Sequence, residues 1–307
     1  MGILYLIAVA PLVLAAAAAA AGWFITGRRV GVPTGSTRVL TVVASSAALV
    51  VMIGYWLLQT LPSLVPAMSY DSDIAIALRY LVPLIAGGIA LLVLAFPVRG
   101  SGSRSEGAEL SRRTVLTFSR LWWFVAFGIV LLLTLTVALA AGSLSSPDEQ
   151  GRYTLYVVRA GTASASTTIY GWHYSVPCLI LLAVLVGIMT VDLALISRPA
   201  LALDRDTDVA VRRVRSLNIV RVGAGAVLLH LSAVLSSLAG TSTLRAGVGT
   251  GASTAGEINV GTSFAALTPL LYWAGAVVGV IGLALWFSAL LSTVPAPANS
   301  RRRVEVG

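Results

Sequence analysis

Two ionisable side chains, His230 and Asp192, lie inside long apolar stretches of this sequence. Ionisable residues are rare inside membrane-spanning helices, and they often mark proton relays or the pathways of ions and substrates. A proton relay or a contact with a transported substrate is therefore the chemistry that these two residues could perform.

His230 stands near the middle of its apolar stretch, on a helical face of small residues. Small residues let helices approach closely, so this face is expected to turn toward other helices. Two interpretations remain open for His230: a neutral imidazole bonded to a neighbouring helix, or a relay or substrate-contact residue. The neighbours at helical spacing are Gly223, Ala226, Ala233 and Ser237.

Asp192 lies about one and a half turns from the end of its apolar stretch, among apolar neighbours. An Asp at the centre of a bilayer costs roughly 2.5–3.5 kcal/mol on insertion scales. We therefore expect a partner from the following basic connections, such as Arg198 or Arg221. Structural pairing and a coupling role are the two interpretations of this residue.

The absence of Lys excludes two chemistries, because all 21 basic residues are Arg. The chain has no lysine for a phosphate-binding loop, and none to form a Schiff base with retinal. With two His and one Cys, a zinc site is not expected. Haem ligation would need both His173 and His230, but His173 stands at the edge of an apolar stretch. We expect no cofactor, no metal and no catalytic residues.

The composition is that of a membrane protein. Hydrophobic residues make up 57% and charged residues 11%, whereas soluble domains are about half apolar and a quarter charged. The mean hydropathy of +0.91 agrees. The isoelectric point near 10.4 arises from Arg in short connections, so it indicates topology and anionic headgroups rather than nucleic acid.

The apolar stretches predict an all-α bundle of seven membrane-spanning helices in a single membrane domain. No basic residue precedes the first stretch, so we expect a retained helix and not a cleaved signal peptide. The expected spans cover residues 3–25, 39–59, 73–97, 121–142, 175–197, 218–240 and 266–292, with a basic tail at 293–307.

The Arg residues predict the orientation of this bundle. The connections after alternate spans, beginning with the first, hold 17 of the 21 Arg residues. Cytoplasmic loops carry the basic excess, so the N-terminus is expected outside and the C-terminus inside. Arg-only basicity with abundant Ala, Gly and Val suggests a bacterial plasma membrane. Inner basic loops could dock a soluble partner through Arg112, Arg113, Arg212, Arg213 and Arg215.

The sequence predicts the local structure of three further segments. The outer connection 143–174 contains alternating residues from Arg152 to Arg159, so a small hairpin or a coil could form there. Residues 206–217 read as a separate surface helix. The motif Gly275-x-x-x-Gly279 suits close helix packing, more often within one chain than between two.

The stretch from Thr168 to Arg215 begins with an aromatic-Gly-Trp motif, continues with Val-Pro and ends with Asp-x-Asp among clustered Arg. It resembles uncharacterised polytopic membrane proteins of actinobacteria, some of which are encoded beside an ABC-type ATPase and a small regulator. The resemblance covers about a sixth of the chain and implies a permease-like subunit whose ATP hydrolysis another protein supplies.

Three functions follow from these features. A transport-related subunit without its own ATPase is expected first, with a soluble ATPase or another membrane subunit as its partner. The alternative is a membrane scaffold or sensor that uses segment 143–174 as its interaction surface. An enzyme acting on lipid comes last, because the sequence offers no pair of nucleophile and base.

Overall fold

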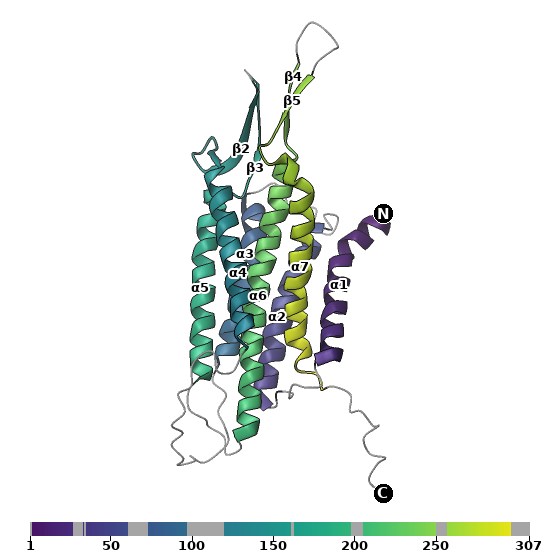
Figure 1. The fold of residues 1–307 in the computed structure, drawn as a ribbon, viewed down its shortest axis with the longest axis vertical. Coiled ribbons are helices and arrows are strands. Elements are labelled where there is room, and N and C mark those ends of the chain that lie inside the picture. Colours follow the sequence, from purple (N-terminus) through teal and green to yellow (C-terminus); the bar gives the residue numbers. More distant parts are fainter. Residues whose placement is uncertain are drawn as a thin grey trace.

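The computed structural model describes residues 2–26, 33, 35–60, 73–96, 120–160, 163–197, 205–249 and 257–295. Within these ranges the chain is mostly helical, with parallel rows of helices and two small sheets at one end (Figure 1). The α-helices are α1 (Gly2–Thr26), α2 (Gly35–Thr60), α3 (Asp73–Ala95), α4 (Leu121–Ser143), α5 (Trp172–Ile196), α6 (Arg205–Ser242) and α7 (Thr268–Leu291).

Helices α2 to α7 are the six described helices that are long and apolar enough to cross a membrane. The apolar helix Val9–Ile25 within α1 is shorter than these six. The chain thus has the helices of a multi-pass membrane protein. Each expected span falls on one helix, and the ends agree within a few residues except at α6.

Helix α6 corrects the sequence-based expectation at its N-terminal end. A surface helix at 206–217 and a span at 218–240 were expected, but one continuous helix runs from Arg205 to Ser242. Its 38 residues extend over about 57 Å, well beyond the hydrocarbon thickness of a bilayer. Figure 1 shows its N-terminal turns projecting past the end of α5.

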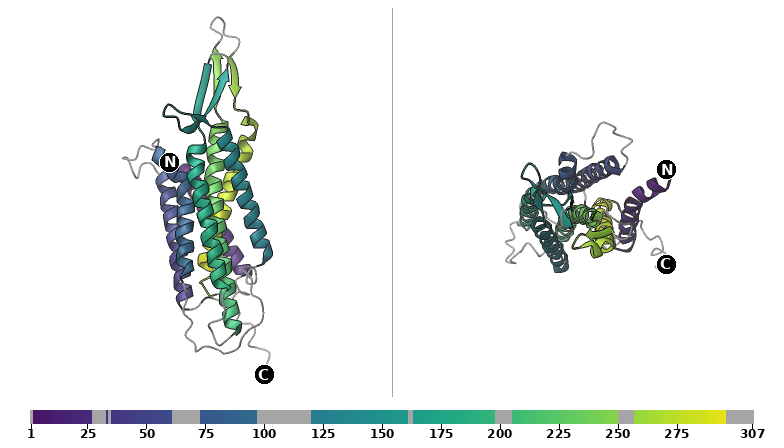
Figure 2. Two further views of the ribbon diagram at one scale, coloured as in Figure 1. Left: turned by 90° about the vertical axis from the view of Figure 1, so that its left-hand side faces the viewer. Right: turned by 90° about the horizontal axis from the view of Figure 1, so that it is seen from above.

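Helix α6 is also the centre of the bundle. In its apolar window 78% of residues are buried, against 22–39% in the other five candidate spans. It packs against α3, α4, α5 and α7, whereas α1 packs chiefly on α7. The view along the bundle shows α1 at the periphery (Figure 2). A movement of α6 would therefore change its contacts with most of the other helices.

Glycines allow α6 and α7 to pack closely. A Cβ atom added at Gly279 would lie 2.7 Å from the Ser232 hydroxyl, which is closer than such atoms approach. The same hydroxyl donates a hydrogen bond to the carbonyl of Gly275, at 2.7 Å. The Gly275-x-x-x-Gly279 motif thus faces another helix of the same chain.

Five strands form a layer at one end of the bundle, which adds β-structure to the all-α fold that was expected. In segment 143–174 the structure has a hairpin, with β2 (Tyr153–Ala160) antiparallel to β3 (Ala163–Thr168) and to the short β1 (Ser146–Pro147). Strands β4 (Arg245–Gly249) and β5 (Glu257–Gly261) form a second hairpin, which the Gly-rich sequence did not predict. We call β1 to β5 the strand layer.

Candidate functional site

His230 is buried in the middle of the bundle, with a bond at each ring nitrogen. Its Nδ1 lies 2.9 Å from the backbone carbonyl of Tyr80 on α3, and its Nε2 lies 3.3 Å from the hydroxyl of Tyr170. A carbonyl can only accept, so Nδ1 carries the hydrogen. In the neutral imidazole Nε2 then accepts a hydrogen bond from the Tyr170 hydroxyl.

A proline lies one turn from the α3 carbonyl that bonds His230. Pro83 stands inside α3 and lacks the N–H that would bond the carbonyl of Arg79, one turn back. Helix geometry is disturbed around such a position, and side chains of neighbouring helices commonly bond the loosened carbonyls. The Tyr80 carbonyl, next to that position, receives its bond from His230.

Tyrosine rings surround His230 on the side of the strand layer. The rings of Tyr80 and Tyr170 lie 4.6 Å apart between centroids, and those of Tyr80 and Tyr174 lie 5.7 Å apart. The Tyr80 hydroxyl donates to Ser237 on α6, at 2.7 Å. We call His230, Tyr80, Tyr170, Tyr174 and Ser237 the His230 cluster. It joins α3 to α6 through buried polar contacts, and α5 packs against it through the ring of Tyr174.

The His230 cluster continues directly into the strand layer. Tyr170 follows β3 by two residues and is fully buried. The backbone N–H of Ile169 donates to the Thr154 carbonyl of β2, at 2.8 Å. Thr241 of α6 donates to the Thr168 carbonyl, at 2.9 Å. A displacement of β3 would therefore be transmitted to Tyr170 and to α6.

An ionic network fixes the same strands to α3. Arg152 forms ion pairs with Asp148, at 2.9 Å between Nε and Oδ2, and with Asp73 in the first turn of α3. Partial burial acts to raise the pKa of Asp148. Hydrogen bonds from the backbone and guanidinium of Arg152, and from Thr154 and Gln150, outweigh that effect and hold the pKa below its usual range.

The second hairpin is joined to the first by an aromatic contact. The Tyr156 hydroxyl of β2 lies 3.1 Å from the Ser263 hydroxyl, and its ring meets Phe264 edge to face with centroids 5.4 Å apart. Phe264 precedes the short 3-10 helix Ala265–Leu267, which leads into α7. The strand layer is thereby attached to α3, α5, α6 and α7.

Asp192, the other intramembrane candidate, lies near the C-terminal end of α5, away from the strand layer. It is 1% exposed, and neither carboxyl oxygen has a hydrogen-bond partner among the described residues. Of its expected partners, Arg221 contacts Asn218 and the Ser288 carbonyl instead, and Arg198 lies outside the described residues. Among the described residues, the cation level with Asp192 is Arg215 of α6. Its neighbour Arg212, one turn earlier, bonds the Ile196 carbonyl one turn after Asp192.

Three arginines of α6 bond carbonyls near the ends of other helices. Arg212 donates to Ile196 at the end of α5, Arg215 to Leu94 of α3 at 3.0 Å, and Arg221 to Ser288 of α7 at 3.4 Å. Carbonyls in a last helical turn lack partners within the helix, and a cation there interacts favourably with the helix dipole.

The five arginines that were expected to dock a partner differ in their exposure. Arg213 is exposed, whereas Arg212 is buried and Arg215 is partly buried against α3. Arg112 and Arg113 lie outside the described residues. On the described part of this face, Arg213 is thus the candidate with its side chain turned outward.

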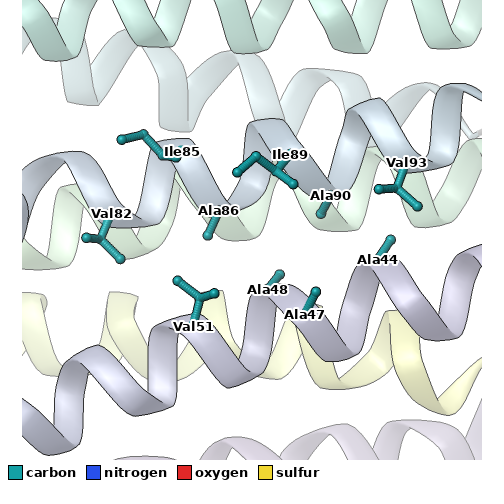
Figure 3. A pocket seen from close by; sticks show the side chains of 10 residues that line it. All are labelled: Ala44, Ala47, Ala48, Val51, Val82, Ile85, Ala86, Ile89, Ala90 and Val93. Carbon is teal, nitrogen blue, oxygen red and sulfur yellow. The ribbon is translucent and has the colours of Figure 1, made fainter.

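The described bundle also has an apolar groove between α2 and α3, with about 110 Å³ of room (Figure 3). It is separate from His230 and Asp192, and its lining side chains offer no ligand for a metal or a charged group. The described residues contain no group of three His, Cys, Asp or Glu side chains that could hold a metal ion. The lining residues are Ala44, Ala47, Ala48, Val51, Val82, Ile85, Ala86, Ile89, Ala90 and Val93.

The sequence pointed to His230 and Asp192 but not to their surroundings. Tyr80 stands in an apolar helix, and its contact with His230 spans 150 residues. Tyr170 was noticed only as an aromatic residue before a span. The local signal for a polar site on α3 was a Tyr in an apolar helix, three residues before Pro83.

Comparison with known proteins yields no match: no family model fits this chain, and no curated protein or solved structure is significantly similar to it.

Proposed function

We propose that this chain is a sensor or scaffold subunit of a bacterial plasma membrane. In this proposal seven helices span the bilayer, with the N-terminus and the strand layer outside and the C-terminus inside. The strand layer binds an extracellular partner or ligand, and α6 carries the effect to its projecting inner turns. A soluble or membrane partner then contacts that inner face.

The observation that carries this proposal is the contact between Tyr170 and His230. Tyr170 belongs to the end of the strand layer, and His230 belongs to the most buried helix. Because α6 bonds the ends of α3, α5 and α7, a displacement of Tyr170 has a physical route to the opposite end of the bundle. Chains of packed side chains and hydrogen bonds of this kind carry energetic coupling between distant sites.

The orientation can be tested first, because Cys178 is the single cysteine. In a Cys178→Ser background, one new cysteine would replace exposed Ser166 on β3 or exposed Arg213 on α6. A membrane-impermeant maleimide should label position 166 in intact cells and position 213 only after permeabilisation. The reverse pattern would overturn the orientation. An N-terminal epitope reached only after permeabilisation would overturn the seven-span count.

The coupling itself is tested with a spin label at position 213 of the protein in lipid nanodiscs. Arg152→Ala removes the ionic link between the strand layer and α3 and should change the mobility of the label. Arg159→Ala, an exposed Arg on β2, the strand that follows Arg152, is the matched control and should not. Adding Tyr170→Phe should abolish the response to Arg152→Ala. Identical spectra in all variants would refute a coupled sensor.

Transport is the second candidate function, and the buried Asp192 without a bonded partner favours it. In that case the chain is a permease-like subunit that relies on a separate ATPase, as the resemblance to actinobacterial membrane proteins implies. Stable co-purification with an ATPase, with hydrolysis reduced by Asp192→Asn, would support this function. Purification without any ATPase from cells that express the neighbouring genes would count against it.

A further inference from the structure

Asp192 occupies a position where an ionised carboxyl group has no bonded partner. It lies on α5 with 1% exposure, and both oxygens lack hydrogen bonds among the described residues. An unpaired charge in such surroundings is strongly unfavourable, whereas a protonated carboxyl group is tolerated at lower cost. Ionisation of Asp192 would therefore require a nearby cation to move.

Arg215 is the cation placed to do so. Helices α5 and α6 run in opposite directions (Figure 1), and Arg212, one turn before Arg215, bonds the Ile196 carbonyl one turn after Asp192. Arg215 therefore stands level with Asp192, although the two side chains are not bonded to each other in this structure. Its Nη2 donates to two carbonyls at the end of α3, those of Leu94 at 3.0 Å and Phe96 at 3.3 Å. Because α3 ends at Ala95, Arg215 caps this helix.

Among the described residues of the helices packed against α5, few other groups at this end of the bundle are charged. Arg212 of α6 also lies at this end of the bundle, but it bonds the Ile196 carbonyl one turn beyond Asp192 on α5. The last four turns of α3 contain no charged residue. At the start of α4 the charged residue is Arg120, which is exposed. Arg215 thus remains as the cation of this set that stands level with Asp192, one turn along α6 from Arg212.

We propose that Asp192 and the end of α3 compete for Arg215, so that the inner end of the bundle has two arrangements. In the arrangement described here, Arg215 caps α3 and Asp192 is unpaired. In the second, Asp192 is ionised and forms an ion pair with Arg215, and the carbonyls of Leu94 and Phe96 are released. The change in Arg215 loosens the contact between α3 and α6.

This device goes beyond the proposed function, because it does not depend on what the strand layer binds. The released carbonyls lie at the end of a candidate span, where water can satisfy them. In buried surroundings the attraction within an ion pair is offset by the cost of desolvating its two charges, so the two arrangements can be close in free energy. Protonation of Asp192 selects between them.

Hydrogen exchange of the full chain in nanodiscs of phosphatidylcholine and phosphatidylglycerol tests the proposal. Wild type and Asp192→Asn are compared at the same pH, so that the intrinsic pH dependence of exchange cancels. At alkaline pH, residues 91–96 should exchange about fivefold faster or more in the wild type. At acidic pH the two proteins should match. Equal exchange at every pH, or faster exchange in Asp192→Asn, would overturn the proposal.

Two further variants separate this result from a general loss of stability. Asp192→Glu keeps an ionisable group and should retain the pH-dependent difference. Arg215→Gln removes the cap, so residues 91–96 should exchange fast at both pH values, and adding Asp192→Asn should change nothing more. An additive effect of the double variant would overturn the competition for Arg215. Residues 121–142 of α4 serve as an internal reference in each spectrum.

Discussion

The hydroxyl of Tyr170 lies 3.3 Å from Nε2 of His230, and this contact joins the end of the strand layer to the central helix. On the other side of the ring, Nδ1 donates to the Tyr80 carbonyl. The imidazole thus connects three parts of the chain that are distant in sequence. Both nitrogens are used, so replacing this residue disturbs more than one element.

His230→Ala is expected to destabilise the bundle by about 2–5 kcal/mol. The change leaves a buried carbonyl and a buried hydroxyl without their partner, at about 1–3 kcal/mol each, and creates a cavity. Thermal unfolding in detergent, followed by circular dichroism, measures the loss. His173→Ala is the matched control, since His173 is the other histidine and is exposed. Equal effects of the two changes would contradict the role assigned to His230.

Gly225→Ala tests the close contact between α6 and α7. A Cβ atom at position 225 would lie 2.4 Å from Cδ1 of Trp286, whose indole N–H donates to the Val222 carbonyl at 2.9 Å. Overpacking of this kind costs about 1–3 kcal/mol, so the melting temperature should fall. Gly128→Ala in α4 has open space around it and should be neutral or stabilise by up to about 1 kcal/mol.

The sequence predicted the helices well because they are long and strongly apolar, but it misplaced the start of α6. Its first turns contain Arg and Asp, which lower the hydropathy and suggest a separate helix. In the structure Arg212 and Arg215 bond the ends of α5 and α3, so the charged turns pack as a continuation of the span. Such bonds join residues far apart in sequence and cannot be read from local periodicity.

The candidate site was predictable only in part for the same reason. His230 and Asp192 stand out because they are ionisable residues in apolar stretches. Their partners do not stand out: Tyr80 provides a backbone carbonyl, and Tyr170 is a Tyr near the end of a span. The small-residue face around His230 indicated close packing, and the buried contacts of α6 agree with it.

Gly279→Leu should lower the stability of the bundle without changing its oligomeric state. Gly279 faces Ser232 of the same chain, so the motif Gly275-x-x-x-Gly279 is occupied by an internal contact. We expect a loss of about 1–3 kcal/mol. Size-exclusion chromatography with light scattering checks the oligomeric state. Gly88→Leu, at a helical position with open space, is the control; a dimer lost only in Gly279→Leu would contradict this assignment.

Acid should loosen the strand layer before it unfolds the helices. Hydrogen bonds from Arg152, Thr154 and Gln150 hold the pKa of Asp148 below its usual range despite partial burial. A carboxyl group whose folded pKa is depressed stabilises the folded state above its unfolded pKa, near 3.9, and this stabilisation is lost as the pH falls through the folded value. Near neutral pH, residues 146–160 should therefore exchange more slowly in the wild type than in Asp148→Asn at the same pH. As the pH falls through the folded pKa of Asp148, exchange in the wild type should rise until the two proteins match. Glu149→Gln, an exposed neighbour, should keep the wild-type profile, and a wild-type profile in Asp148→Asn would exclude Asp148 as the cause.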